Sequence, residues 1–279
     1  MSDLSQLTRQ HYEKNESGAS LVSKVAAILD SLPEGAVDSS QLAGLDQFHV
    51  MGLEATKQLA QIAGIESSAA VLDAGSGLGG PSRYLASTYG CQVIGVDLSP
   101  SFVAVAQLLA QRAGLNAQVS YQTGDLLALP FPDSSLDLVW TQHVVMNISD
   151  RERVYSEFKR VLRPGGKLAF FDVLATDAKP ELQFPVPWAE NSGTSFLLTK
   201  DETSSLLATV GFTITTWNDV TIEVPNWIAQ QRPAAQRISL GVIMGPRFGE
   251  MSVNFARNIR EGRIRLVMAV CTADGAQRR

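Results

Sequence analysis

The stretch AAVLDAGSGLGGPSRYLA, residues 69–86, decides the fold. It begins with a short apolar run, 70–75, that favours a strand, continues through a group of glycines, and then opens a helix. Glycines in such a turn let the backbone approach a ligand closely and adopt conformations that other residues avoid. The pattern therefore predicts a nucleotide-type ligand at the point where a strand turns into a helix.

Apolar, β-branched runs alternate with helical patterns along the rest of the chain. The predicted strands cover 70–75, 92–97, 119–125, 136–142, 167–173, 213–221 and 264–270. Two of the intervening helices carry start signals, Ser99 followed by Pro100 and Thr199 followed by Glu202. This alternation predicts an α/β, Rossmann-like fold with a seven-stranded, mostly parallel sheet and helices on both faces.

We expect one domain over residues 1–279. It divides into an N-terminal helical cap (1–68), a ligand-binding core (69–224), an inserted lid (225–262), and the last strand with a tail (263–279). The cap and the lid fall outside the strand–helix alternation. We therefore expect both of them to cover the carboxyl ends of the strands, where such sheets bind ligands.

The composition excludes several classes of partner. The chain is 45% hydrophobic and 18% charged with a net charge of −5, an acidic balance that disfavours binding to nucleic acid. Two cysteines, Cys91 and Cys271, fit a reducing compartment, and no apolar run is long enough to span a bilayer. We expect a cytoplasmic protein with no membrane partner and no metal site, since no His, Cys and carboxylate cluster has ligand spacing. A homo-oligomer is possible.

Two kinds of ligand could occupy the glycine turn. Gly75, Gly77 and Gly80 match the G-x-G-x-x-G pattern of dinucleotide binding. Gly75, Gly77 and Gly79 behind Asp73 match the glycine loop that binds S-adenosylmethionine (AdoMet). A carboxylate at Asp73 would repel a pyrophosphate but attract the ammonium and sulfonium of AdoMet, so its charge favours AdoMet.

Further motifs agree with AdoMet. Asp97 follows the second strand, where an acid can accept hydrogen bonds from ribose hydroxyls, and Leu98 comes next. Asp125 and Leu126 end the third strand, and the segment RVLRPGGKLAFFDV follows the fourth. On these motifs residues 69–173 resemble a class I AdoMet-dependent methyltransferase.

The resemblance implies a role for each motif. Asp73, Gly75, Gly77 and Gly79 would hold the methionyl part, and Asp97 with Leu98 the ribose. Asp125 and Leu126 would hold the adenine, while Gln142 would contact the cofactor near the reaction centre. Tyr12, beside His11, would close over AdoMet from the N-terminus. His11 on its own is expected to be exposed.

The segments 45–56, 140–148, 184–197 and 258–270 extend the resemblance to the sarcosine/dimethylglycine N-methyltransferase group. His143 and His49 are the candidate catalytic residues, although each could equally be a structural histidine. Gln47, His49, His143, Trp188 and Met244 are the candidate contacts to a small-molecule substrate. Trp188 could present an aromatic face to a methylated amine.

The expected activity is methyl transfer from AdoMet to a small molecule, with a nitrogen acceptor preferred because a neutral amine needs no base during transfer. O- or C-methylation of a hydrophobic secondary metabolite is an alternative. The fourth strand ends in TQHV, which lacks the Pro-Pro-aromatic motif of enzymes that methylate bases or glutamine. An NAD(P)-dependent oxidoreductase and a methyltransferase-fold protein that does not methylate remain as further alternatives.

Overall fold

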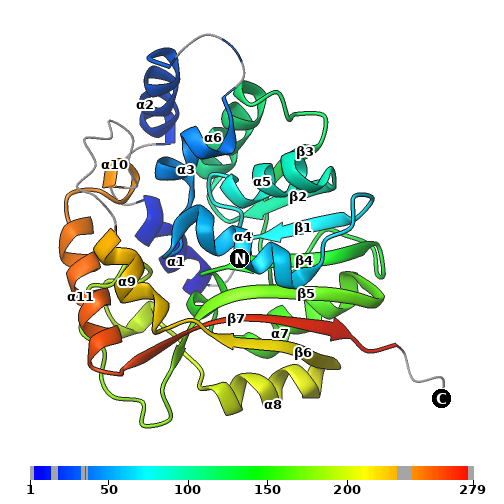
Figure 1. Ribbon diagram of the computed structural model, residues 1–279, viewed down its shortest axis with the longest axis vertical. Coiled ribbons are helices and arrows are strands. Elements are labelled where there is room, and N and C mark those ends of the chain that lie inside the picture. The colour runs from blue at the N-terminus through cyan, green and yellow to red at the C-terminus, as the bar shows by residue number, and fades with distance from the viewer. Residues whose placement is uncertain (1–2, 14–17, 33–34, 36, 231–240, 276–279) are drawn as a thin grey trace.

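The computed structural model describes residues 3–13, 18–32, 35, 37–230 and 241–275. In this part of the chain seven strands form one sheet (Figure 1). They are β1 (Ala70–Ala74), β2 (Gln92–Asp97), β3 (Val119–Thr123), β4 (Leu136–Gln142), β5 (Leu162–Ala175), β6 (Phe212–Asp219) and β7 (Ile264–Ala273). Every predicted strand is present, and the α/β prediction is confirmed.

The strand order is β3-β2-β1-β4-β5-β7-β6. The chain moves outward from β1 to β2 and β3, then crosses back to place β4 on the other side of β1. A crevice forms at such a switch point, between the carboxyl ends of β1 and β4, and it is the usual ligand site of this architecture. β7 runs antiparallel to both β5 and β6, so the sheet is mostly parallel, as predicted.

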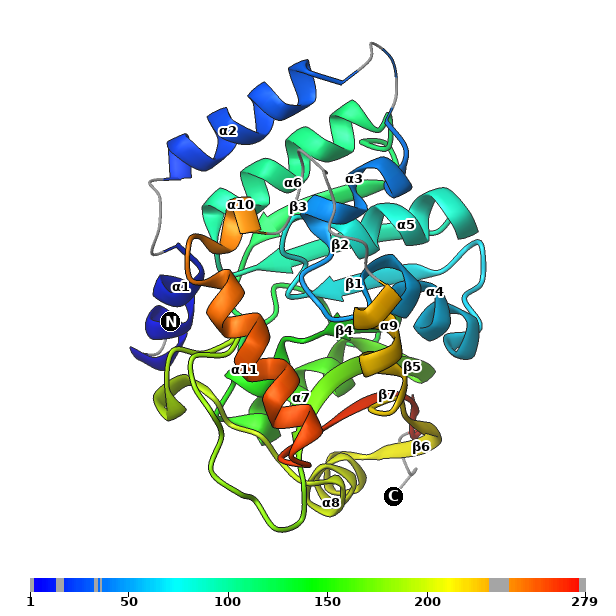
Figure 2. The same cartoon turned by 60° about the vertical axis from the view of Figure 1, so that its left-hand side comes forward.

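Helices cover both faces of this sheet (Figures 1 and 2). They are α1 (Asp3–Glu13), α2 (Gly18–Asp30), α3 (Ser39–Asp46), α4 (Gly52–Ala63), α5 (Gly80–Tyr89), α6 (Pro100–Arg112), α7 (Arg151–Val161), α8 (Lys200–Val210), α9 (Glu223–Gln230), α10 (Gly241–Met244) and α11 (Phe248–Arg260), with short 3-10 turns at Val145–Asn147 and Ser192–Thr194. Among the described residues no helix has both the length and the apolar character needed to cross a membrane.

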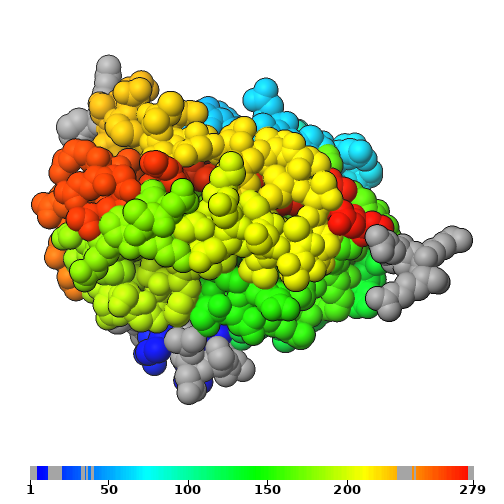
Figure 3. Space-filling view, turned by 90° about the horizontal axis from the view of Figure 1, so that it is seen from below, coloured from blue at the N-terminus to red at the C-terminus, as the bar shows by residue number. Residues whose placement is uncertain are grey.

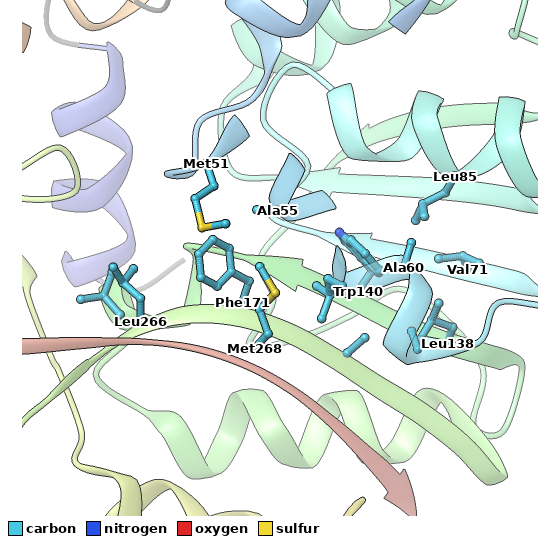
Figure 4. Packing of buried hydrophobic residues seen from close by; sticks show 14 of the residues in the cluster. Met51, Ala55, Ala60, Val71, Leu85, Leu138, Trp140, Phe171, Leu266 and Met268 are labelled. Carbon is cyan, nitrogen blue, oxygen red and sulfur yellow. The ribbon is translucent and has the colours of Figure 1, made fainter. Parts of the chain in front are cut away.

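Alternate strand residues build two separate cores. On one face Leu138, Trp140 and Phe171 pack with Ala55 of α4, as Figure 4 shows. The opposite face packs on α7 and α8, and Figure 3, which views the molecule from below, shows α8 and β6, in yellow, in the middle of that face. Helix α2 packs on α6 instead of the sheet and so forms an outer layer.

Local signals explain where the helices begin. The Ser99 hydroxyl accepts the Phe102 N–H at 3.2 Å, and Pro100 occupies the first turn of α6. Thr199 and Glu202 form the reciprocal capping box that the sequence predicts at the start of α8.

Strand β5 is longer than the predicted 167–173. Leu136 pairs with Leu162 and Leu138 with Lys167, so residues 163–166 bulge out of the ladder. Gly165 has φ +79°, a left-handed conformation that glycine adopts without strain. These residues therefore form a bulge inside β5, and α7 ends at Val161, directly before the strand begins.

Candidate active site

A cleft opens at the carboxyl ends of β1, β2 and β4, with α1 along one wall. Its empty space, including the solvent-open mouth, measures about 940 Å³. It is lined by many of the residues that the sequence singles out, namely Gly75, Gly77, Asp97, Leu98, Asp125, Leu126, Gln142 and His143.

The glycine loop turns sharply between β1 and α5. Gly75, Gly77 and Gly79 all have left-handed φ angles, between +52° and +77°. A Cβ added at Gly75 would lie 2.5 Å from a methyl of Val144, so a side chain has no room there. The loop is therefore restricted to glycine by conformation and by close packing.

The Asp97 carboxylate fixes this loop to the end of β2. One oxygen accepts the Gly77 N–H at 2.8 Å and the other accepts the Ser99 N–H at 2.9 Å. Each carboxylate oxygen has two lone pairs, and this side chain lines the cleft. Asp97 is thus placed to accept hydrogen bonds from ligand hydroxyls.

Asp125 and Leu126 form the next part of the wall. The Asp125 carboxylate accepts the Leu127 N–H at 3.0 Å and the Ser5 hydroxyl at 3.3 Å, which joins α1 to the end of β3. Leu126 is buried and presents an apolar surface to the cleft. One acidic and one apolar group therefore lie side by side, as a purine ring with an exocyclic amine would require.

Asp73 lies behind the glycine loop and is not part of the cleft wall. Its carboxylate accepts the Ser82 hydroxyl at 2.5 Å and is 2% exposed. Burial raises the pKa of Asp73 to about 7. The predicted contact of Asp73 with the methionyl part stays a prediction.

A largely buried polar cluster adjoins the cleft, because two of its members, Gln142 and His143, line the cleft wall. We define it as Gln47, His49, Thr56, Gln142 and His143. The Thr56 oxygen lies 2.9 Å from Oε1 of Gln47, 3.2 Å from Oε1 of Gln142, and 3.2 Å from Nε2 of His49. The His49 and His143 rings are 6.1 Å apart. The fold therefore brings together residues from the cap and from the end of β4.

Two nitrogen atoms of this cluster have no hydrogen-bond partner among the described residues: Nε2 of Gln142 and Nε2 of His143. The Trp140 indole N–H donates to Oε1 of Gln142 at 3.0 Å and so orients the amide. Unpaired buried donors cost free energy, so the cluster is suited to binding a polar group that the protein itself does not supply.

Both clustered histidines are neutral at neutral pH. Burial lowers the pKa of His49 to about 4, opposed by a contact with the Val50 carbonyl. Burial and the neighbouring His49 lower the pKa of His143 well below 6.5. A neutral imidazole can accept a proton, although a low pKa makes it a weak base.

The structure places two other predicted residues, Trp188 and Met244, away from the cleft wall. Trp188 is buried, packs edge-on against Phe255 at 6.1 Å, and donates its indole N–H to Ser195. Met244 is buried at the end of α10. The side chain of Tyr12 lies outside the described residues. The substrate and cofactor roles of all three stay predictions.

One expectation is wrong. His11 is buried, because its Nε2 lies 3.1 Å from the Pro187 carbonyl where α1 meets the loop after β5. Sequence analysis also missed Phe48 and Phe102, whose rings lie 5.4 Å apart and line the cleft. Phe48 lies between Gln47 and His49, two predicted substrate contacts, and this position was the signal in the sequence that could have identified it as part of the site.

The chemistry of these donors and acceptors fits AdoMet. Asp97 can accept from ribose hydroxyls, and Asp125 with Leu126 suits an adenine. The unpaired Nε2 of Gln142 can donate to a carboxylate such as that of the methionyl part. A buried carboxyl behind the loop, at Asp73, is unfavourable for a pyrophosphate.

Comparisons with known proteins agree with this fit. A family model described as a methyltransferase domain matches residues 72–170. A chloroplastic protein named probable tocopherol O-methyltransferase, from Oryza sativa subsp. japonica, is 44% identical over 98 residues, which is 35% of this chain and 27% of that protein. Phosphoethanolamine N-methyltransferase 1 from Arabidopsis thaliana is 30% identical over 133 residues, 48% of this chain and 27% of that protein. The chain thus matches less than a third of the length of these two relatives.

Among solved structures, geranyl diphosphate C-methyltransferase from Streptomyces coelicolor A3(2) superposes with a TM-score of 0.72 over 98% of both chains, at 16% identity. At that identity the likeness concerns the fold. The N-terminal helices and the helices between β6 and β7 are therefore part of a fold that the two proteins share. With the strand order, the glycine loop and the family match together, residues 72–170 are a methyltransferase domain, and the described sheet has the class I methyltransferase fold.

Proposed function

We propose that this chain transfers the methyl group of AdoMet to a small molecule. The observation that carries the proposal is the placement of Asp97 beside the glycine loop, with its carboxylate bonded to the Gly77 N–H and facing the cleft. The polar cluster adjoins this cleft, because its members Gln142 and His143 also line the cleft wall. A cofactor site and an acceptor site are therefore continuous.

When bound, AdoMet supplies a methyl group on a sulfonium whose departure leaves a neutral thioether. In our proposal the protein chiefly orients the reactants and excludes water. Asp97 holds the ribose, Asp125 with Leu126 the adenine, and Asp73 the charge of the methionyl part. Side chains of α1, including Thr8 and Arg9, line the cleft and limit access of solvent to it.

The acceptor would bind against the polar cluster, with Gln47, His49 and His143 as its contacts. Trp188 and Met244 would contact only an acceptor large enough to reach the loop after β5 and the lid. We infer a nitrogen acceptor first, because a neutral amine attacks without a base. The neutral imidazoles favour a hydroxyl acceptor as a second candidate, since they can take its proton.

Replacing Asp97 by Ala should weaken AdoMet binding by about 1–3 kcal/mol, because it leaves ribose hydroxyls without an acceptor. Asp97→Asn should fall between Ala and the wild type, since its single carbonyl can still accept the Gly77 N–H. Isothermal titration with AdoMet measures both variants. Unchanged affinity in Asp97→Ala would reject the ribose contact, and a wild-type protein that binds NADH but not AdoMet would reject the proposed function.

The replacement of His143 by Asn separates the two acceptor classes. For a hydroxyl acceptor we expect kcat to fall by about a hundredfold, near the lower end of general-base effects, because a low-pKa imidazole is a weak base. For an amine acceptor, assayed at a pH above the pKa of the amine, we expect kcat to change by no more than about threefold. Release of S-adenosylhomocysteine (AdoHcy) from panels of matched amines and alcohols provides the measurement, with His49→Asn run in parallel. A hundredfold loss with an amine would contradict the assignment.

A further inference from the structure

Four residues, the last of α3 and the three that follow it, contact both halves of the proposed active site. We call residues 46–49 the bridge segment. Asp46 ends α3, and Gln47, Phe48 and His49 lead into the turn before α4. Figures 1 and 2 show α3 and α4 lying beside α5, the helix that follows the glycine loop.

Asp46 anchors the bridge segment to the glycine loop through a buried ion pair. One carboxylate oxygen lies 2.6 Å from Nη2 of Arg83, and both side chains are 1% exposed. Arg83 also donates from Nη1 to the Leu78 carbonyl at 2.8 Å, inside the loop itself. A single guanidinium therefore holds the cap and the loop together in a region that excludes water.

The packing at the start of α5 is equally close. A Cβ added at Gly80 would lie 2.5 Å from the Asp46 carbonyl and 2.6 Å from Nε2 of Gln47. One added at Gly77 would lie 3.6 Å from the Phe48 ring. A shift of the loop on ligand binding would therefore reach the bridge segment directly, since closely packed groups transmit displacement.

The other side chains of the segment point to the reaction side. Phe48 lines the cleft and packs on Phe102. Gln47 and His49 both contact the Thr56 hydroxyl in the polar cluster. Successive residues of one short segment thus contact the loop, the cofactor cleft and the acceptor site.

We propose that the bridge segment couples the two sites: a cofactor on the glycine loop orders residues 46–49 and so completes the acceptor site. Arg83 and Asp46 are positioning residues in this scheme, because neither lines the cleft. The inference rests on the proposed function, since it needs the loop to hold AdoMet or AdoHcy.

The test measures hydrogen–deuterium exchange of peptides covering residues 45–51, with and without saturating AdoHcy. In the wild type we expect AdoHcy to slow exchange of this segment by at least about tenfold, the sign of an ordered local unit. In the double variant Asp46→Asn/Arg83→Gln, which removes both charges together, we expect AdoHcy still to bind and the slowing to be lost. Phe48→Ala should also lose the slowing. Because this variant keeps the ion pair, it provides the test if the double variant does not fold.

The double variant Lys179→Gln/Glu202→Gln is the matched control, because it removes an exposed ion pair far along the chain. It should retain the full slowing. Bound AdoHcy that leaves residues 45–51 unchanged in the wild type would overturn the inference, as would slowing that persists in both bridge variants. Failure of the wild type to bind AdoHcy would instead refute the proposed function, and the inference with it.

Discussion

Replacing Gly79 by Ala should lower the free energy of unfolding by about 4 kcal/mol, the sum of left-handed strain and overpacking. Gly79 precedes α5 with φ +75°, and an added Cβ would lie 2.5 Å from Cζ of Tyr121. Tyr121 cannot move aside without cost, because its hydroxyl donates to the Gly79 carbonyl at 3.1 Å inside the core. Urea denaturation provides the measurement.

Gly90 is the matched control for this substitution. It caps the other end of α5 with φ +74°, yet an added Cβ would meet nothing within 4 Å. Gly90→Ala should therefore show the strain alone, about 1–2 kcal/mol. Equal losses in the two variants would show that the Tyr121 contact places no constraint on the glycine loop.

Replacing Asp73 by Asn should stabilise the protein at pH 8 and weaken AdoMet binding. Burial raises the pKa of this carboxyl from 3.8 to about 7. Because the folded-state pKa is the higher one, the stability tied to this group is fully present below about pH 4 and is lost as the pH rises through 7. This difference in pKa corresponds to about 4 kcal/mol in favour of the protonated carboxyl. That figure is the upper limit for the gain in the free energy of unfolding of Asp73→Asn.

Affinity should move in the opposite direction. A cation bound near Asp73 favours the ionised carboxyl, so the wild type should bind AdoMet more tightly at pH 8 than at pH 6, and Asp73→Asn should lose at least about tenfold at pH 8. Titrations at both pH values, with thermal unfolding of the same samples, check the two effects. Asp177→Asn, at an exposed site, controls for the loss of one charge. Unchanged AdoMet affinity in Asp73→Asn would mean that the carboxyl serves only to hold Ser82.

A comparison of AdoMet with AdoHcy shows which charge Asp73 contacts, because AdoHcy keeps the ammonium but lacks the sulfonium charge. If Asp73 acts on the ammonium, both ligands should weaken equally in Asp73→Asn. If it acts on the sulfonium, AdoMet alone should weaken.

Much of the core could be predicted because its determinants are local. Alternating apolar runs specify strands, and the caps at Ser99 and Thr199 need only residues three positions apart. The glycine loop could be predicted for the same reason, since left-handed turns leave a compositional trace. The start of β5 could not, because a bulge depends on the register with β4.

The contacts that unite the site are non-local, and no sequence pattern indicates them. Asp46 and Arg83 meet only once the cap has packed on α5. His49 and His143 were separate candidates in the sequence, and their approach to 6.1 Å depends on the path between α3 and α4. Trp188 resembled an exposed aromatic platform, yet the packing of α11 against its loop buries it.

The position of β7 has a consequence for how this protein folds. β6 is at the edge of the sheet, and its partner there is β7. Until β7 inserts, β6 has no ladder to join, and insertion requires Ala175 to meet Ile264 across a long intervening chain. Such closure is slow and late. Assembly of this half of the sheet should therefore trail the β3-β2-β1-β4 half, and under native conditions the amide protons of β6 should exchange no later than those of β7.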